Sequence, residues 1–115
     1  MANNVHAGQP VIEMGASPED ANQVVILLHG RGATAESLRP LVDELASEGR
    51  RFLLPQAGLN RWYPSTAFGP LAANEPDLSF ALARVDALVQ QAQEQGFSAQ
   101  QIALGGFSQG ACLAA

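Results

Sequence analysis

The chain has 115 residues, of which 47% are hydrophobic and 15% are charged, and its formal net charge at pH 7 is -5. This length allows one ordinary domain, and the composition is typical of a globular protein and not of a disordered one. All six basic residues are arginine and they are outnumbered by eleven acidic residues, so the basic surface of a nucleic-acid-binding protein is missing.

No segment reaches the roughly 18 apolar residues of a membrane span, and the N-terminal region lacks the basic and apolar pattern of a secretory leader. We therefore expect a cytoplasmic protein with no membrane-spanning segment. The single cysteine, Cys112, has no partner for an intramolecular disulfide. We expect it to be a buried packing residue and not a reactive thiol.

The first 30 residues predict a frayed start followed by two strands. Residues 1–10 are polar and are expected to be frayed, and residues 11–14 predict a short edge strand that ends at Gly15. Residues 23–28 form a continuous β-branched and aliphatic run, which predicts a strand buried on both faces of a sheet. This strand leads directly into a tight, glycine-containing turn at residues 29–32.

An amphipathic helix is predicted after that turn. Thr34 or Ser37 can cap its start, Pro40 is tolerated in its first turn, and Gly49 ends it. Its apolar stripe has the spacing i, i+3, i+4, i+7, and consists of Leu38, Leu41, Val42 and Leu45.

The next segment combines a strand, a long loop and a second helix. Residues 51–54 predict a strand, and residues 56–76 predict a loop whose length is more typical of a functional segment than of a simple connection. The helix predicted over residues 77–95 begins at a capping pair, Asn74 and Asp77, and ends at Gly96. Its expected apolar side consists of Leu78, Leu82, Val85, Val89 and Ala92.

A last strand, predicted over residues 101–104, completes an alternation of strands and helices. Such an alternation favours a parallel sheet with right-handed crossovers and helices on its faces. The fold class predicted from the sequence is therefore α/β.

Residues 106–110 read Gly-Phe-Ser-Gln-Gly, a G-x-S-x-G pattern placed where a strand changes into a helix. A serine on so sharp a turn has a strained backbone, and Gly106 and Gly110 allow neighbouring backbone to approach without a Cβ. The backbone N–H of Gln109, at the start of the new helix, would point toward the charge of a tetrahedral intermediate. The alternative interpretation is an ordinary Gly/Ser turn.

Four short motifs together resemble the bacterial phospholipase/carboxylesterase family, whose members are α/β-hydrolases related to acyl-protein thioesterases. They are Leu-Leu-His-Gly-Arg-Gly at 27–32, Trp-Tyr-Pro at 62–64, Asn-Glu-Pro at 74–76 and Gly-Phe-Ser-Gln-Gly at 106–110. The resemblance extends from about Val24 to Ala115. It implies an α/β-hydrolase fold with a mostly parallel sheet, truncated after the nucleophile elbow, in which residues 1–115 are the N-terminal part of one domain.

The same resemblance assigns roles to particular residues. Ser108 would be the nucleophile, and the backbone N–H groups of Arg31 and Gln109 would form the oxyanion hole. Trp62 and Tyr63 would wall the substrate pocket. The elbow and its neighbouring turn would be shaped by His29, Gly30, Gly32, Gly106 and Gly110.

Each of these roles has a simpler alternative. Arg31 is also compatible with a solvated loop arginine, and Trp62 and Tyr63 with core aromatics that pin the long loop. His29 is expected to be a structural, hydrogen-bonded histidine, because in this fold the catalytic base follows the serine in the chain.

The catalytic triad is incomplete in this sequence. Only seven residues follow Ser108, and none of them is acidic or a histidine, while His6 and His29 are the only histidines. Without a base a serine is a poor nucleophile, so the chain alone is expected to be nearly inert. We expect the Asp and His in a C-terminal half that is deleted, cleaved or located in another chain, with the strand near Leu104 left as an apolar edge.

The function expected from these features is that of a serine carboxylesterase or thioesterase, acting on small to medium acyl esters through an acyl-enzyme. No metal or cofactor is implied. The partners considered are a small-molecule acyl ester or thioester, with a complementing C-terminal chain or a homo-oligomer. The alternatives are another α/β-hydrolase chemistry, such as a dienelactone hydrolase-like or peptidase-like activity, or a non-catalytic fragment or binding module.

Overall fold

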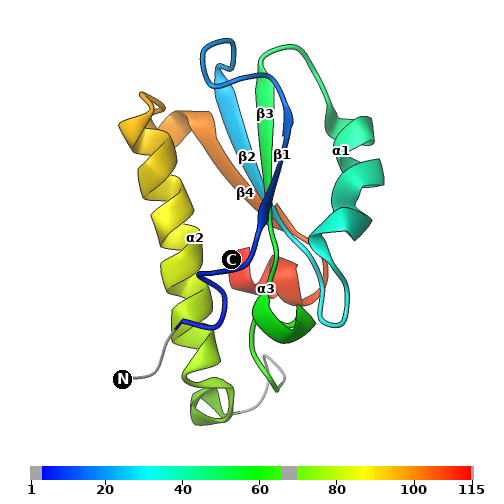
Figure 1. The fold of residues 1–115 in the computed structure, drawn as a ribbon, viewed down its shortest axis with the longest axis vertical. Coiled ribbons are helices and arrows are strands. Elements are labelled where there is room, and N and C mark those ends of the chain that lie inside the picture. The colour runs from blue at the N-terminus through cyan, green and yellow to red at the C-terminus, as the bar shows by residue number, and fades with distance from the viewer. Residues whose placement is uncertain (1–3, 66–69, 115) are drawn as a thin grey trace.

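The computed structural model describes residues 4–65 and 70–114, and Figure 1 shows them as a twisted sheet with a helix on either side. The sheet has four strands in the order β1-β3-β2-β4. The strands are β1 (Val11–Gly15), β2 (Gln23–Leu28), β3 (Arg50–Pro55) and β4 (Ile102–Gly106). The helices are α1 (Arg39–Leu45), α2 (Asp77–Glu94) and α3 (Gln109–Ala114).

The pairing of the strands confirms the predicted α/β class. β2 pairs in parallel with both β3 and β4, whereas β1 pairs antiparallel with β3 at one edge. The crossover from β2 to β3 passes through α1 on one face, and the crossover from β3 to β4 passes through α2 on the other (Figure 1). The sheet is therefore mostly parallel, and the short edge strand that the sequence predicts is present and runs antiparallel to β3.

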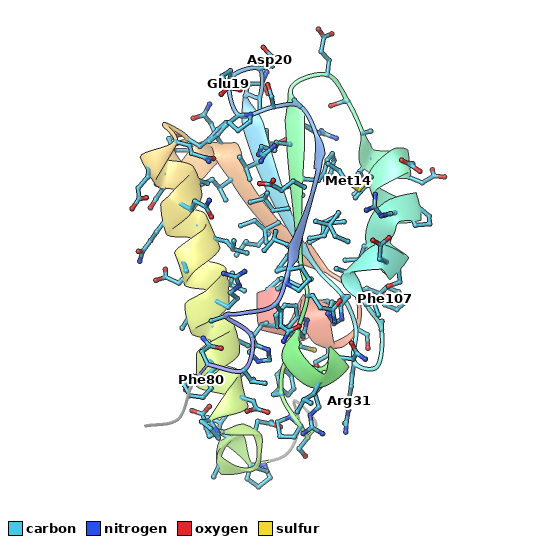
Figure 2. The ribbon with its side chains drawn as sticks, in the orientation of Figure 1. Met14, Glu19, Asp20, Arg31, Phe80 and Phe107 are labelled. Atoms are coloured by element: carbon cyan, nitrogen blue, oxygen red, sulfur yellow. The ribbon has the colours of Figure 1, made fainter. Side chains whose placement is uncertain are left out.

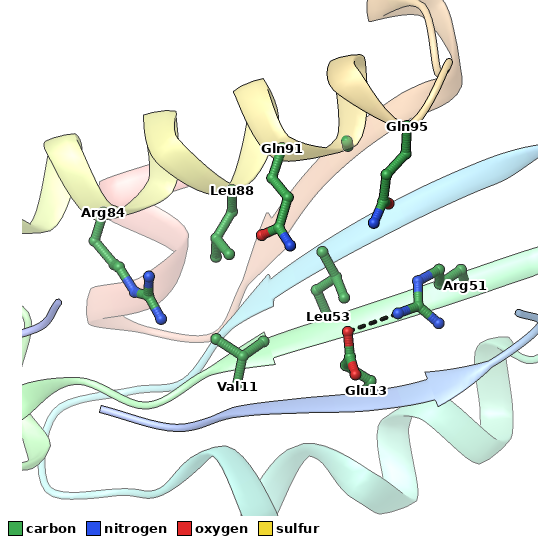
Figure 3. A pocket seen from close by; sticks show the side chains of 9 residues that line it. Val11, Glu13, Arg51, Leu53, Arg84, Leu88, Gln91 and Gln95 are labelled. Atoms are coloured by element: carbon green, nitrogen blue, oxygen red, sulfur yellow. Dashed lines mark hydrogen bonds and ion pairs between the residues drawn. The ribbon is translucent and has the colours of Figure 1, made fainter. Parts of the chain in front are cut away.

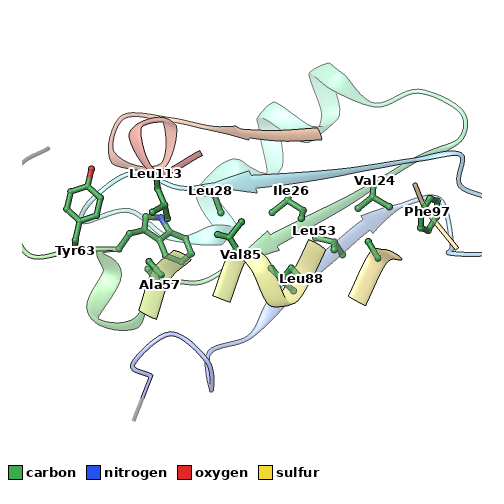
Figure 4. Close-up of a cluster of buried hydrophobic side chains, with 13 residues drawn as sticks. Val24, Ile26, Leu28, Leu53, Ala57, Tyr63, Val85, Leu88, Phe97 and Leu113 are labelled. Carbon is green, nitrogen blue, oxygen red and sulfur yellow. The ribbon is translucent and has the colours of Figure 1, made fainter. Parts of the chain in front are cut away.

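β2 is buried on both faces, as its uninterrupted apolar sequence predicts. Val24, Ile26 and Leu28 pack into the cluster beneath α2 (Figure 4), while Leu27 belongs to the cluster beneath α1. Successive residues of a strand point to opposite faces, so one strand contributes to both layers. Burying a Leu or Ile side chain contributes roughly 1.5–3 kcal/mol, so β2 stabilises the packing on both faces of the sheet.

The helix after β2 is shorter than predicted. A 3-10 turn over Ala35–Leu38 precedes α1, and the Thr34 hydroxyl caps it by accepting the Ser37 N–H at 3.3 Å. α1 ends at Leu45 and does not extend to Gly49. The Arg50 guanidinium donates to the Leu45 carbonyl at 2.8 Å, so a side chain from the next strand satisfies the helix end.

α2 has nearly the predicted length, but its buried stripe and its cap differ. The residues that face the core are Ala81, Val85, Leu88 and Ala92. Leu82 was expected in this stripe and is 51% exposed. Asn74 does not cap the helix, because its side-chain oxygen accepts the Ser65 N–H at 2.6 Å; the Glu75 carboxylate accepts the Ser79 N–H instead, at 2.7 Å.

The prediction of a frayed N-terminus is wrong for residues 4–10, and residues 1–3 lie outside the described part of the chain. Asn4 donates from its amide to the Phe80 carbonyl at 2.9 Å, and His6 is fully buried. The composition of this segment is polar, but its polar groups find partners in the body of the domain. Polarity alone therefore did not indicate mobility here.

β4 forms the edge of the sheet opposite β1. Leu104, in the middle of this strand, is 43% exposed, and Phe107, just after it, is 69% exposed. The predicted apolar edge is thus present in the structure. Across the described ranges, no helix combines the length and apolar character that crossing a lipid bilayer requires.

Candidate functional site

Ser108 lies on the turn that joins β4 to α3, and this turn has the backbone geometry that the G-x-S-x-G pattern requires. Its φ is 56°, in the left-handed region that residues with a Cβ rarely occupy, and the side chain is exposed. The Phe107 N–H donates to the Leu28 carbonyl at 3.0 Å, and the Gly110 N–H donates to the Phe107 carbonyl at 3.0 Å. The turn is therefore held both to β2 and to itself.

The two glycines of the pattern lie where backbone meets backbone. A Cβ on Gly106 would lie 2.5 Å from the carbonyl oxygen of Gly110. A Cβ on Gly110 would overlap the carbonyl of Leu28 and lie 2.6 Å from that of His29. Any side chain at either position would force the turn apart, which explains why glycine stands at both.

The turn at residues 29–32 lies directly beside Ser108. β2 and β4 are paired so that Leu28 is opposite Gly106, and both strands end at the same edge of the sheet. A Cβ on Gly30 would lie 3.4 Å from the Cβ of Ser108. Gly32 has φ 77°, and its N–H donates to the Asn60 carbonyl at 2.7 Å, which ties this turn to the long loop.

The two backbone donors expected in the oxyanion hole, those of Arg31 and Gln109, have no acceptor among the described residues. Within residues 4–65 and 70–114, neither the Arg31 N–H nor the Gln109 N–H donates to another residue. The Arg31 side chain is exposed, and Figure 2 shows it in the lower half of the molecule, away from the upper end that carries Glu19 and Asp20. The exposure of the Arg31 side chain agrees with the alternative of a solvated loop arginine. Its backbone N–H, in contrast, can bind an acceptor.

His29 is a buried structural residue. Its Nδ1–H donates to the Gly30 carbonyl at 2.8 Å, and its Nε2 accepts the Ala57 N–H at 3.0 Å. Burial lowers the pKa of this imidazole, so the neutral ring that these bonds require is favoured. Both ring nitrogens are engaged, and neither can take a proton from Ser108.

His6 is a second structural histidine, which the sequence analysis placed in a frayed segment. Its Nε2–H donates to the Trp62 carbonyl at 3.0 Å, and its Nδ1 accepts the Gly58 N–H at 3.0 Å. Burial is the largest effect on this ring and lowers its pKa. No local sequence signal marks His6, because its partners are more than 50 residues away along the chain.

Trp62 occupies the space between the two histidines. Its side chain has no exposed surface, and its ring centre lies 5.3 Å from that of His6 and 5.1 Å from that of His29. The indole N–H donates to the His29 carbonyl at 2.9 Å. These contacts are those of a core aromatic that pins the long loop, the alternative considered for Trp62 alongside a pocket wall.

Tyr63 lines a cavity of about 250 Å³ between the long loop, α2 and α3. Burial raises the pKa of its hydroxyl. Cys112 lines the same cavity and is exposed, which contradicts its expected burial. The reason is helical geometry: α3 buries Gln109, Gly110 and Leu113, so Ala111 and Cys112 lie on its exposed side.

The side chain of Gln109 is a site feature that no sequence pattern predicts. Its Oε1 accepts the Trp62 N–H at 2.7 Å, and its Nε2–H donates to the Tyr63 carbonyl at 2.8 Å. The residue is 8% exposed. It connects the Ser108 turn to the long loop through two buried hydrogen bonds.

Two further cavities have different surroundings. One, of about 430 Å³, adjoins the Ser108 turn and is apolar; it is lined by Gly30, Ala33, Ser37, Leu38, Leu41 and Phe107. The other, of about 250 Å³, lies beneath α2 near the β1 edge and contains the ion pair of Arg51 with Glu13 at 2.6 Å (Figure 3). Among the described residues, no group of three His, Cys, Asp or Glu side chains is arranged to hold a metal ion.

Comparison with known proteins agrees with this geometry. Residues 7–115 match the phospholipase/carboxylesterase family over most of the chain. The chain belongs to this family. A search of curated proteins gave no significant match.

Solved structures of the phospholipase/carboxylesterase family and related esterases share the fold. A phospholipase/carboxylesterase from Dyadobacter fermentans superposes with a TM-score of 0.85 at 37% identity, covering 93% of this chain and 51% of that one. Esterase PE8 gives a TM-score of 0.65 at 25% identity, with coverages of 92% and 54%. Acyl-protein thioesterase 2 from Zea mays, at 17% identity and a TM-score of 0.67, shares the fold over 92% of this chain and 49% of its own.

These comparisons confirm the resemblance inferred from the motifs and the α/β-hydrolase fold. The chain spans about half the length of the solved structures that it matches. The matched half contains the Ser108 turn, the turn at residues 29–32 and the long loop.

Proposed function

We propose that this chain carries the nucleophile and the oxyanion hole of a serine hydrolase that cleaves carboxylic esters or thioesters. The observation that supports this most directly is the left-handed backbone of exposed Ser108, on a strand-to-helix turn where two glycines meet neighbouring backbone. Strain of this kind costs roughly 1–3 kcal/mol and is concentrated at functional sites. Membership of the phospholipase/carboxylesterase family favours the same chemistry.

In the proposed reaction the Ser108 Oγ attacks the acyl carbonyl carbon and its proton passes to a base. The carbonyl oxygen becomes an oxyanion, which accepts hydrogen bonds from the backbone N–H groups of Arg31 and Gln109. The alcohol or thiol then leaves with a proton, and water hydrolyses the acyl-enzyme by the reverse sequence. The two unused amides next to Ser108 support this assignment.

The base has to come from outside these 115 residues. His6 and His29 are the only histidines in the sequence, and both are buried with both ring nitrogens hydrogen-bonded. We place the triad Asp and His in a second half, corresponding to the part of the solved relatives that this chain does not cover. Loss of the base typically lowers the rate by about 10⁴-fold or more.

Substrate size follows from the cavities near the serine. The apolar cavity beside Phe107 and the cavity lined by Tyr63 and Leu78 both suit hydrocarbon groups. We therefore propose small to medium acyl groups as substrates. A panel of acyl esters, thioesters, dienelactones and peptides would distinguish this activity from the other chemistries of the fold.

Labelling with a fluorophosphonate probe, combined with intact mass under denaturing conditions, tests the proposed function. A species heavier than the 12.1 kDa of this sequence, or a second co-purifying chain, should accompany labelling at Ser108. Ser108→Ala should abolish labelling, and Ser17→Ala, at the far end of the molecule, should leave it unchanged. A 12.1 kDa chain that never labels, alone or with its complement, would favour the non-catalytic binding module.

A further inference from the structure

Gln109 contributes to the site in two ways, through its backbone N–H beside Ser108 and through its side-chain amide. Its backbone N–H, expected in the oxyanion hole, has no acceptor among the described residues, whereas its side chain binds the long loop. The side-chain oxygen accepts from Trp62 at 2.7 Å, and the side-chain nitrogen donates to Tyr63 at 2.8 Å. A primary amide can satisfy this donor and acceptor pair in only one orientation.

These two bonds connect the reacting serine to a cavity wall. Tyr63 lines the cavity of about 250 Å³ together with Cys112 and Leu113 of α3. The backbone of Trp62 and Tyr63 is held to the first residue of α3 by the Gln109 side chain. One buried amide thus joins that wall directly to the residue that follows Ser108.

We propose that the Gln109 side chain is a positioning residue: it sets the place of the Trp62–Tyr63 backbone relative to Ser108 and so determines substrate affinity. This inference rests on the proposed function, because it concerns the substrate cavity of the same serine. It assigns the backbone and the side chain of one residue to different tasks. The backbone acts on the oxyanion, and the side chain holds the wall of the cavity.

The loop does not depend on this amide for its fold. The Trp62 indole is held by the His29 carbonyl at 2.9 Å, and the Trp62 carbonyl accepts from His6 at 3.0 Å. Removing the Gln109 amide would leave a buried N–H and a buried carbonyl without partners, and the backbone of the loop would shift to find others. We expect a local displacement and not unfolding.

The first test is Gln109→Met, which keeps the length of the side chain and removes both hydrogen bonds. Trp62 is the only tryptophan of these 115 residues, so the fluorescence of this chain, measured without a complement, reports on this loop. We expect a changed emission maximum and faster quenching by acrylamide. In the form of the protein that labels at Ser108, we expect KM to rise about tenfold while kcat changes less than about threefold.

Gln101 offers a matched control. Its side chain also accepts one backbone N–H, from Ser98 at 2.8 Å, and donates to one backbone carbonyl, of Asn22 at 3.1 Å. It precedes β4, at the opposite end of the strand from Ser108. Gln101→Met should therefore leave both the Trp62 emission and KM at their wild-type values.

The second test is Gln109→Glu, in which a change of pH switches the hydrogen bonds to Trp62 and Tyr63 off and on. The ionised carboxylate can accept from Trp62 but faces the Tyr63 carbonyl without a donor, whereas the protonated acid can accept and donate as the amide does. We expect Trp62 emission to differ from wild type at pH 8 and to return toward it near pH 5. A merely structural role would not produce this reversal.

The wild-type protein, titrated over the same range, supplies the reference for that measurement. His6 and His29 flank Trp62, Arg61 precedes it in the loop, and the Tyr63 hydroxyl and the Cys112 thiol lie on the cavity side. The difference between Gln109→Glu and wild type removes their contributions. Gln101→Glu should show no such difference.

The outcomes distinguish the positioning role of the Gln109 side chain from the proposed nucleophile role of Ser108. Unchanged Trp62 emission and KM in Gln109→Met, or a fall in kcat as large as the rise in KM, would overturn the positioning role. Wild-type protein that never labels at Ser108 would instead overturn the proposed function, and the fluorescence measurements would still decide whether the amide positions the loop.

Discussion

The chain contains two regions of opposite character, which the Gln109 side chain connects. Around Trp62, two histidines, a tryptophan and their backbone partners are fully buried and hydrogen-bonded. At Ser108 the side chain is exposed on a left-handed backbone, and two neighbouring amides are unused within the described ranges. The titratable rings that could have served as bases are used to hold the loop.

This difference shows how a fold can separate support from chemistry. Satisfied buried polar groups make a region rigid, and an unpaired donor in the same place would be costly. The hydrogen bonds that stabilise the fold lie around Trp62. The left-handed backbone, and the backbone N–H groups that can bind a reacting carbonyl oxygen, lie at the Ser108 turn. We expect substitutions in the first region to affect mainly stability, and those in the second to affect mainly reactivity.

The largest loss of stability is expected from Trp62→Ala. Truncating a fully buried tryptophan costs about 3–5 kcal/mol, and here the His29 carbonyl would also lose its donor. Urea denaturation followed by circular dichroism measures this change without tryptophan fluorescence. Leu71→Ala, at a residue that is 71% exposed, should change stability by less than about 0.5 kcal/mol. Similar losses for the two variants would contradict the central role of Trp62.

The next largest effect is expected from Gly110→Ala. The added methyl group would overlap the backbone of Leu28 and His29, and overpacking of this kind costs about 1–3 kcal/mol or more. Probe labelling should fall together with stability, because the Ser108 turn would open. Gly8→Ala provides the control, since no atom lies within 4 Å of its added methyl group. Normal labelling of Gly110→Ala would show that the turn tolerates a Cβ.

Most of the fold was readable from the sequence because its signals are local. The apolar run at β2, the position of β3 before the long loop and the extent of α2 depend on periodicity and on terminators a few residues away. The Ser108 turn could also be predicted from the sequence, because its geometry requires glycine at two fixed positions, 106 and 110. The family motifs added the expectation that the turn at residues 29–32 lies beside it.

Two of the errors concern partners that are distant in the sequence. The sequence predicts a frayed segment around His6, because nothing near this residue indicates that Gly58 and Trp62 bind its ring. The Gln109 side chain was overlooked for the same reason, since its partners lie 46 and 47 residues away. Side-chain amide and imidazole groups can donate to and accept from many kinds of partner. Only the structure therefore shows which groups they bind.

Acid should weaken the Trp62 region first. Burial lowers the pKa values of His6 and His29 below the roughly 6.5 of an unfolded histidine, so the unfolded chain takes up protons first. The stability from these neutral rings is complete above pH 6.5 and is lost as pH falls from there toward the folded pKa values. The slope is at most about 1.4 kcal/mol per pH unit for each histidine.

Urea denaturation at pH 7.5, 6.5 and 5.5 measures this loss. The carboxylates with shifted pKa values, Glu36 and Glu75, titrate at still lower pH, because hydrogen bonds from Arg39 and Ser79 lower their pKa values. With only two histidines in the chain, their ring resonances can be followed individually by NMR. Constant stability between pH 7.5 and 5.5, or rings that titrate near 6.5, would contradict buried neutral histidines.

The smallest effect, and the most specific, concerns the strain at Ser108. Ser108→Ala and Ser108→Gly both remove the hydroxyl and should both abolish labelling, but only the glycine variant removes the Cβ from a backbone with φ 56°. Relief of about 1–2 kcal/mol of left-handed strain, less the greater entropy of glycine in the unfolded chain, should leave Ser108→Gly more stable than Ser108→Ala by about 0.5–1 kcal/mol. Urea denaturation monitored by Trp62 fluorescence can resolve this difference. An alanine variant at least as stable as the glycine variant would mean that the Ser108 turn stores no strain, and the contrast with the Trp62 region would then rest on the free amides alone.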